Sequence, residues 1–155
     1  TFRDAASLTN HLVDLIRSRM PAPEAPFATL DDVRRYSYQD MLDVSARFAN
    51  ALVALGVKPG DRVAVQVEKS IEALMLYLGT VRAGAIFLPL NTAYTPAEIE
   101  YFLGDAEPAV FVCDPAKAGA LKPYADKACA QLETLGVWLS ARVSAVPLST
   151  WDSLS

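Results

Sequence analysis

One stretch, residues 62–90, constrains the fold more than any other part of the sequence. Arg62–Val67 is a short segment, half of it β-branched, that follows a Pro-Gly-Asp turn, and Ala85–Leu90 is a second apolar run that follows Gly84. Both segments are typical of strands. Ile71–Gly84 carries a helical pattern between them. A connection of this length suits a crossover helix and not a hairpin, so we expect the two strands to be parallel.

Strands and helices continue to alternate on both sides of this unit. The resulting β-α-β-α-β-α-β order predicts an α/β fold, mainly a parallel sheet with crossover helices. The expected elements are a helix from Tyr38 capped by Ser37, a helix over Pro96–Leu103 that ends at Gly104, a strand over Ala109–Cys113, a helix from Asp114-Pro115 to about Leu132, and a strand over Leu135–Leu139. In the helix from Tyr38, we expect an apolar face of Met41, Leu42, Ser45, Phe48, Ala49 and Leu52, opposite a polar face of Asp43, Arg47 and Asn50.

The N-terminal region predicts a helix followed by a short hairpin. Leu8, Leu12, Leu15, Ile16 and Met20 recur at helical spacing, which predicts an amphipathic helix over Ala6–Arg19. Phe27–Leu30 and Arg35–Ser37 predict a hairpin around Asp31-Asp32. The expected organisation over residues 1–155 is one partial domain: helix and hairpin over 1–37, an α/β core over 38–139, and a loosely specified polar end over 140–155.

The central helix is more apolar than a surface helix should be. Ile71, Leu74, Met75 and Leu78 form one apolar face, and Ala73, Leu76, Tyr77 and Val81 occupy much of the remainder. Such a helix is normally buried on nearly all sides. We therefore expect it to lie between two layers, one of them outside this chain. The alternative is a chance excess of apolar residues on a surface helix.

Composition and charge exclude several classes of protein. The chain is 52% hydrophobic and 21% charged with a net charge of −4, so it can bury a core and is a poor partner for nucleic acid. No apolar run reaches about 18 residues, and we expect neither a membrane span nor a signal peptide. Cys113 and Cys129 are not in metal-ligand spacing, and we expect free thiols of a cytoplasmic protein.

Chemical motifs that would complete an active site are missing. The seven glycines form neither G-x-G-x-x-G nor G-x-x-x-x-G-K, so no loop is built to surround phosphates. His11, the only histidine, has no nucleophile or acid near it in the sequence, and we expect a surface residue. The paired carboxylates Asp31-Asp32 and Glu98/Glu100 occupy turn or helix positions. We assign no catalytic residue and no metal ligand.

Two segments nevertheless resemble core motifs of the AMP-forming adenylating enzymes, the group of acyl-CoA synthetases, luciferases and adenylation domains. Tyr36–Met41 resembles the (S/T)-Y-x-E-L motif, and Val81–Asn91 resembles L-K-A-G-x-A-Y-x-P-(L/I)-D. Gly60–Ala64 and Tyr94–Leu103 fit the same family, and the resemblance covers roughly residues 27–139. The segments 68–94 and 112–115 look closest to malonyl-CoA synthetases within it.

The resemblance implies a two-step reaction. ATP and a small carboxylate, malonate among the choices, give an acyl-adenylate and pyrophosphate, and CoA then displaces AMP. The full-length enzyme would use ATP, Mg²⁺ and CoA, and its N-terminal domain is a larger layered αβαβα structure. The family's phosphate loop, acyl pocket, ribose-binding aspartate and mobile lysine come later in its sequences. We therefore expect this chain to be an N-terminal fragment that is inactive alone, binds no cofactor and exposes an apolar face through which it could self-associate. The alternative is a non-catalytic α/β binding or scaffold module.

The resemblance also suggests a few site residues. In acetyl-type relatives, basic residues after the strand matching Ala109–Cys113 touch the CoA nucleotide, and Lys117 and Lys122 occupy that neighbourhood. Arg82 and Asn91 lie within the second motif. For Arg82 we favour a structural role, in an ion pair or in solvent, and for Asn91 a turn-capping role over a ligand contact at the strand end.

Overall fold

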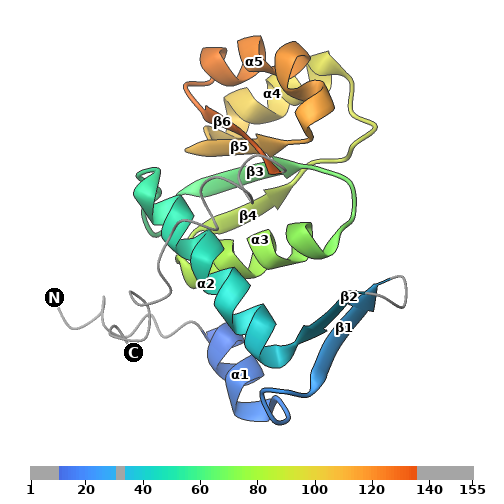
Figure 1. Cartoon of the computed structure of the whole chain (residues 1–155). Helices are drawn as coiled ribbons and strands as arrows, with labels where there is room; N and C mark the ends of the chain where they lie inside the picture. Colours follow the sequence, from blue (N-terminus) through green and yellow to red (C-terminus); the bar gives the residue numbers. More distant parts are fainter. Residues whose placement is uncertain (1–10, 31–33, 136–155) are drawn as a thin grey trace, which may run out of the picture.

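A four-stranded parallel sheet with the order β4-β3-β5-β6 forms the centre of the computed structural model, which describes residues 11–30 and 34–135. The strands are β3 (Arg62–Gln66), β4 (Ile86–Pro89), β5 (Val110–Cys113) and β6 (Gln131–Thr134). Helices α2 (Tyr38–Ala54) and α3 (Ile71–Arg82) cover one face, and α4 (Pro96–Ala106) and α5 (Ala118–Lys127) cover the other, as Figure 1 shows. The predicted α/β fold with parallel strands is confirmed.

The two central strands send alternate side chains to the two faces of the sheet. Val63, Val65, Val110 and Val112 belong to the core beneath α2 and α3. Ala64, Phe111 and Cys113 belong to the core beneath α4 and α5. Strands that are covered on both faces must be apolar at nearly every position, which explains why Val-Ala-Val and Val-Phe-Val-Cys occur at the centre of the sheet.

Helix α3 is covered by helix α2 as well as by the sheet. It packs against α2 so closely that a Cβ atom on Gly79 would lie 2.5 Å from Phe48 Cβ and 2.9 Å from the Ser45 carbonyl oxygen. Met75 and Leu76 are buried in the core that α2, α3 and the sheet share. Helix α2 on one side and the sheet on the other therefore cover most of α3, whereas Leu74 on the predicted apolar face remains 40% exposed. The expectation of a further covering layer outside the chain stays a prediction.

Helix α2 is buried over a wider face than the sequence predicted. Its start is confirmed: Ser37 Oγ accepts a hydrogen bond from Asp40 N at 3.1 Å, and Asp40 Oδ2 accepts one from Ser37 N at 2.9 Å. After the helix, the chain turns through Gly56 in the left-handed conformation (φ 90°). Asn50, however, is buried and not on an exposed polar face. The reason is that α2 contacts both α3 and the valine-rich core, so a single apolar stripe does not describe its buried surface.

Three predicted boundaries in the second half of the chain were wrong. Helix α4 runs through Gly104 to Ala106 and ends at Glu107, which adopts the left-handed conformation (φ 45°). After β5, Pro115–Lys117 form a 3-10 turn that Asp114 does not cap with its side chain, and α5 ends at Lys127 instead of near Leu132. A left-handed turn at Cys129 (φ 57°) then leads into β6. This strand starts at Gln131, four residues earlier than predicted, and residues 136–139 lie outside the described part of the chain.

The N-terminal elements lie beside α2 and α3. Helix α1 (His11–Arg19) buries Val13, whereas Leu12 and Leu15 are 39% and 47% exposed, so the predicted apolar face was partly wrong. His11 is exposed, as expected. The hairpin is confirmed as β1 (Pro26–Leu30) and β2 (Arg34–Ser37). The expectations for residues 6–10, 31–33 and 140–155 fall outside the described residues.

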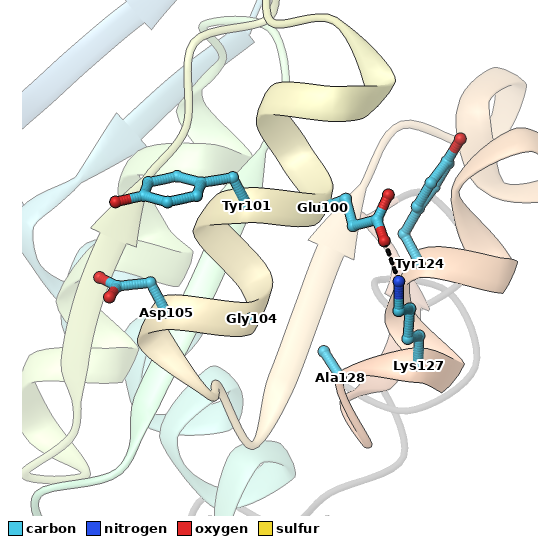
Figure 2. A pocket seen from close by; sticks show the side chains of 7 residues that line it. All are labelled: Glu100, Tyr101, Gly104, Asp105, Tyr124, Lys127 and Ala128. Atoms are coloured by element: carbon cyan, nitrogen blue, oxygen red, sulfur yellow. Dashed lines mark hydrogen bonds and ion pairs between the residues drawn. The ribbon is translucent and has the colours of Figure 1, made fainter.

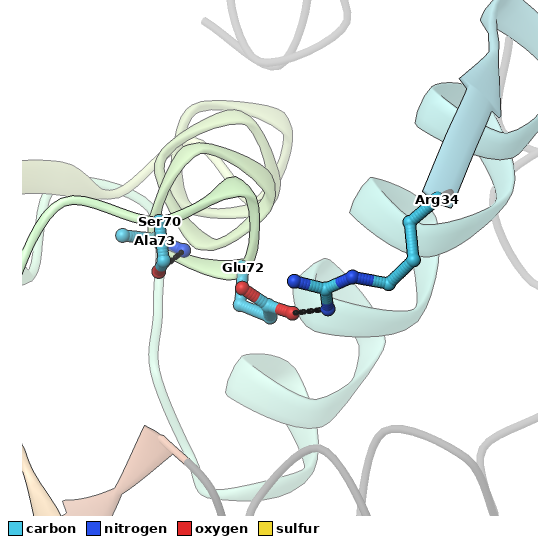
Figure 3. A network of polar contacts seen from close by, with 4 residues as sticks. All are labelled: Arg34, Ser70, Glu72 and Ala73. Atoms are coloured by element: carbon cyan, nitrogen blue, oxygen red, sulfur yellow. Dashed lines mark hydrogen bonds and ion pairs between the residues drawn. The ribbon is translucent and has the colours of Figure 1, made fainter. Parts of the chain in front are cut away.

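An exposed ion pair joins the hairpin to the start of α3. Arg34 Nη1 lies 3.6 Å from Glu72 Oε1, and the neighbouring Ser70 caps α3 by accepting a hydrogen bond from Ala73 N at 3.1 Å (Figure 3). The arginine side chain is 56% exposed, so the pair contributes at most about 1 kcal/mol. Within the described ranges, the structure contains no helix with the length and apolarity that a membrane crossing requires.

Candidate functional site

The carboxyl edge of the sheet between β3 and β5 is the place where this fold can bind a ligand. The chain leaves β3 toward β4 through α3 on one face, and leaves β5 toward β6 through α5 on the other face. Crevices outside such a reversal of strand order are the usual ligand sites of open α/β sheets. The residues that follow β3, β4 and β5 therefore form the candidate site.

Gln66, the last residue of β3, is fully buried at this edge. Its Nε2 donates a hydrogen bond to the Asn91 carbonyl oxygen at 2.9 Å and so holds the start of the β4–α4 loop. Its Oε1 is buried and accepts no hydrogen bond from the residues that the structure describes. The orientation of the amide is set by Asn91, since an oxygen in place of Nε2 would face a carbonyl oxygen. The sequence analysis did not single out Gln66, although a polar residue at the end of an apolar strand was the available signal.

Lys117, which follows β5, reaches the same loop. Its Nζ donates a hydrogen bond to the Thr92 carbonyl oxygen at 3.1 Å in a partly buried contact. Its positive charge also acts on Cys113, the last residue of β5. Two side chains from different strand ends, Gln66 and Lys117, therefore hold consecutive carbonyl groups of the β4–α4 loop.

Lys122, the second predicted CoA contact, lies elsewhere. It is on α5, and its Nζ forms an exposed ion pair with Asp126 Oδ1 at 2.7 Å, one helical turn away. Its side chain is 61% exposed. The structure thus separates the two lysines: Lys117 lies at the carboxyl edge of the sheet, and Lys122 belongs to the surface of a covering helix.

The acidic side chain at this edge of the sheet, Asp114, is hydrogen-bonded to the backbone, and its negative charge disfavours a bound anion. Asp114 Oδ2 accepts a weak hydrogen bond from Glu68 N at 3.3 Å, which ties the ends of β5 and β3 together. Burial raises the pKa of the Cys113 thiol to about 11; the Asp114 charge raises it as well, and Lys117 opposes them. Cys113 is therefore a neutral thiol at physiological pH and no nucleophile.

The two residues of the second sequence motif have structural roles. Asn91 Oδ1 accepts a hydrogen bond from Ala93 N at 2.9 Å, which confirms the turn-capping role. Arg82 is buried, and its Nη1 donates to the Leu42 carbonyl oxygen at 2.7 Å and to Ser45 Oγ at 3.0 Å. The arginine therefore joins α3 to α2, and its structural role is confirmed; since it is buried, it is not simply solvated.

A surface groove between α4 and α5 is a second candidate for a ligand site. It has a volume of about 420 Å³, and Figure 2 shows Glu100 of α4 directed at Lys127 of α5, with Tyr101 and Asp105 on the far side of α4. Glu100 and Lys127 form an ion pair, and the hydrogen bond from this pair raises the pKa of Lys127. The shift favours the charged form of Lys127, which is the wrong direction for a general base. The groove contains an ion pair that joins two helices but no acid–base or nucleophile pair.

Metal binding finds no support in the described part of the chain. No group of three or more His, Cys, Asp or Glu side chains there is arranged to hold a metal ion. Among the described residues, the carboxyl edge of the sheet therefore offers one lysine, two held backbone carbonyl groups and a buried amide oxygen, and we identify no group there that could carry out a covalent step.

Comparison with known proteins agrees with this geometry. The family described as AMP-binding enzyme matches residues 17–148. The crystal structure of ATP-bound MatB from Rhodopseudomonas palustris superposes with a TM-score of 0.84 at 38% identity, covering 92% of this chain and 29% of that one.

Curated relatives show the same partial coverage. The long-chain-fatty-acid–CoA ligase FadD13 of Mycobacterium tuberculosis is 32% identical over 110 residues, which is 69% of this chain and 21% of the relative. The acyl-CoA ligase sidI of Aspergillus fumigatus is 34% identical over 73 residues, 47% of this chain and 12% of the relative. The chain thus spans at most about a fifth of these relatives, and it belongs to the AMP-binding enzyme family.

Proposed function

We propose that this chain is the N-terminal part of an AMP-forming acyl-CoA synthetase. The complete enzyme would join a small carboxylate to ATP as an acyl-adenylate, release pyrophosphate, and transfer the acyl group to CoA with loss of AMP. The observation that carries the proposal is the family match over residues 17–148. The structural likeness to ATP-bound MatB at 38% identity supports it.

In this proposal the described residues form scaffold and not catalyst. They provide no cluster suited to Mg²⁺, so we derive no step through the metal. The sequence has no glycine-rich phosphate loop, so ATP would be bound chiefly by other parts of the enzyme. The contribution of this chain is a rigid sheet edge, on which Gln66 and Lys117 hold the β4–α4 loop beside the crevice.

Malonate is the substrate we propose to test first. The segments 68–94 and 112–115 resemble malonyl-CoA synthetases, and MatB is among the similar solved structures. A cytoplasmic location belongs to the same proposal, since ATP and CoA would both be needed. The test is pyrophosphate release from ATP by the longest protein that contains this chain, with malonate, acetate and a long-chain fatty acid compared. Malonate should give the fastest release, whereas release that is the same with and without a carboxylate would refute the proposal.

We propose that Lys117 contacts a phosphate group of CoA. The lysine uses one of its three N–H groups on Thr92, so two remain for an anionic ligand at the edge of the crevice. The neighbouring Asp114 carboxylate works against an anion, so a single contact is expected. Lys122 is the less favoured candidate for this role, because it lies on the surface of α5 and pairs there with Asp126.

The matched pair of lysine variants tests this assignment in the complete enzyme. Lys117→Ala should raise the KM for CoA about 5- to 20-fold, equivalent to about 1–2 kcal/mol for one charge-assisted contact, and leave adenylate formation unchanged. Lys122→Ala should change neither quantity. An unchanged KM for CoA in Lys117→Ala, or an equal loss of adenylate formation, would show that the lysine only supports the loop.

Self-association of the isolated chain is a further part of the proposal. Strand β4 pairs on one side only within the described residues, and its Ile86 is 49% exposed. Unpaired apolar edge strands favour intermolecular pairing. Sedimentation of the purified chain should show dimers or larger species at micromolar concentration, and Ile86→Lys should reduce them. A monomer at all concentrations would contradict this part.

A further inference from the structure

The α4–α5 side of the sheet carries two adjoining hollows that have no place in the proposed reaction. The first is the groove described above, and the second has a volume of about 460 Å³ and includes Glu107 and Cys129 in its lining. The two hollows share Gly104 of α4 and, at the end of α5, Lys127 and Ala128. They therefore form one feature, here called the α4–α5 depression, on the opposite face of the sheet from α2 and α3.

Gly104 lies where the two hollows meet. It is part of helix α4, so no left-handed conformation requires a glycine there, and a Cβ atom would meet nothing within 4 Å. Gly79 of α3 shows the contrast, because helix α2 occupies the space that its Cβ atom would need. A helical glycine costs up to about 1 kcal/mol relative to alanine, and it allows close approach of another group. The space above Gly104 is therefore open to a side chain from another molecule.

An exposed aromatic ring and a carboxylate flank this glycine. Tyr101 is 67% exposed, and Asp105 follows it by one helical turn, so both lie on the same side of Gly104 in Figure 2. The ion pair of Glu100 and Lys127 lies on the other side. A tyrosine ring attracts a cation to its face, and a carboxylate one turn further along the helix adds to that attraction. Tyr101 and Asp105 together are thus suited to one positively charged side chain.

The end of α4 is negative and only partly compensated. Asp105 and Glu107 are exposed, and among the described ion pairs none involves either carboxylate. The last turn of α4 has no basic residue, and carboxylates at the C-terminus of a helix oppose its dipole. Arg62 Nη1 donates a hydrogen bond to the Ala106 carbonyl oxygen at 2.8 Å, which compensates the helix end but not the two carboxylates. A positive charge from another molecule would therefore be stabilising here.

Exposed apolar side chains indicate that the rest of the complete enzyme packs elsewhere. Leu74 of α3 and Val53 of α2 are 40% and 51% exposed, and both helices cover the opposite face of the sheet. On the described α4 and α5, Tyr101 is the one large apolar side chain that is exposed. Permanent interfaces are more apolar than transient ones, which combine aromatic residues with a polar rim. The α4–α5 depression therefore suits a separate protein that binds reversibly.

We propose that the α4–α5 depression is a docking surface for a separate protein that presents an arginine or lysine beside an apolar side chain. The apolar side chain lies over Gly104, the cation contacts the ring of Tyr101 and the carboxylate of Asp105, and Glu107 adds to the attraction. The inference does not depend on the acyl-CoA synthetase proposal, because the depression is formed by the covering helices and not by the carboxyl edge of the sheet.

A peptide titration tests this surface, with Cys129 as the reporter. Cys129 is an exposed free thiol in the lining of the second hollow, so a docked peptide should slow its reaction with a thiol reagent. The probe is the peptide Leu-Arg-Leu-Arg with both ends capped, and the control peptide has neutral citrulline in place of arginine. The arginine peptide should slow the labelling of Cys129 saturably, whereas the citrulline peptide should have no saturable effect.

Matched variants locate the bound peptide. Gly104→Leu should abolish the protection of Cys129, because the new side chain fills the depression. Gly119→Leu should retain it, because this helical glycine of α5 also has open space around it but lines neither hollow. Leucine is a good helix former, so both variants should fold. Asp105→Asn should weaken binding by about 2- to 5-fold, the effect of one exposed ion pair. Protection is the ratio of labelling rates without and with peptide in each variant.

Several results would overturn the inference. Labelling of Cys129 that no peptide concentration changes, or equal protection by the two peptides or in the two leucine variants, would show that the depression does not recognise a cationic segment. Labelling that slows as the concentration of the chain rises, without peptide, would assign the face to a second copy. Slow labelling in the longest protein that contains this chain would assign it to the rest of the enzyme. Should Gly104→Leu fail to fold, the comparison of the two peptides decides alone.

Discussion

The close contact of α2 and α3 at Gly79 allows a quantitative test of the packing. In Gly79→Ala, the new Cβ would lie 2.5 Å from Phe48 Cβ, 2.9 Å from the Ser45 carbonyl oxygen and 3.0 Å from Ala49 N. Two of these three atoms are backbone, so a side-chain rotation cannot relieve the clash and α2 must shift. Overpacking of this kind costs about 1–3 kcal/mol, against which alanine gains about 1 kcal/mol in helix propensity.

The expected net effect of Gly79→Ala is therefore a destabilisation of up to about 2 kcal/mol, or up to roughly 8 °C in the thermal midpoint. Gly104→Ala is the matched control, because this glycine is also helical but a Cβ there would meet nothing within 4 Å. It should stabilise the chain by up to about 1 kcal/mol. Urea denaturation of both variants measures the difference. If Gly79→Ala is as stable as Gly104→Ala, the α2–α3 contact is not as close as described.

Further predictions concern the two cysteine thiols and the cap of α4. Because the folded pKa of Cys113 is about 11 against an ordinary 9.0, the unfolded chain loses this proton first, and stability should fall more between pH 9 and 11 in the unmodified chain than in Cys113→Ala. A thiol reagent at pH 8 should label only the exposed Cys129, and equal labelling of both would contradict the buried placement. Thr95→Ala should lower the free energy of unfolding, measured by urea denaturation, by about 1 kcal/mol, because it disrupts the capping box with Glu98. Thr92→Ala is the control, because Lys117 binds the carbonyl oxygen of Thr92 and not its side chain, and it should cost less than half as much.

Elements with a strong local signal could be predicted from the sequence. Ser37 with Asp40 and Thr95 with Glu98 form capping boxes, and both helices begin at the predicted residues, Tyr38 and Pro96. The apolar strands β3 and β5 were also predictable, because strands covered on both faces must be apolar throughout. Local sequence patterns were therefore sufficient to predict capped helix starts and strands that are covered on both faces.

Elements whose ends depend on tertiary contacts were predicted poorly. Glu107 and Cys129 adopt left-handed backbone conformations that non-glycine residues rarely take, so neither turn was visible in the sequence. Strand β6 lies at the edge of the sheet, and polar Gln131 and Glu133 occupy alternate positions along it. Because such a strand lacks a continuous apolar run, its start was predicted as the end of a helix. In the candidate site, Lys117 was named for its chemistry, but only the fold reveals that Gln66 holds the same loop.

The nucleotide product of the complete enzyme tests the central claim most directly. Labelled ATP, malonate and the longest protein containing this chain should first give an acyl-adenylate and pyrophosphate in the absence of CoA. Addition of CoA should then convert the adenylate to acyl-CoA and AMP in equal amounts. Release of ADP and phosphate, or no carboxylate-dependent turnover of ATP with any acid tested, would contradict the assignment of this chain to an AMP-forming acyl-CoA synthetase.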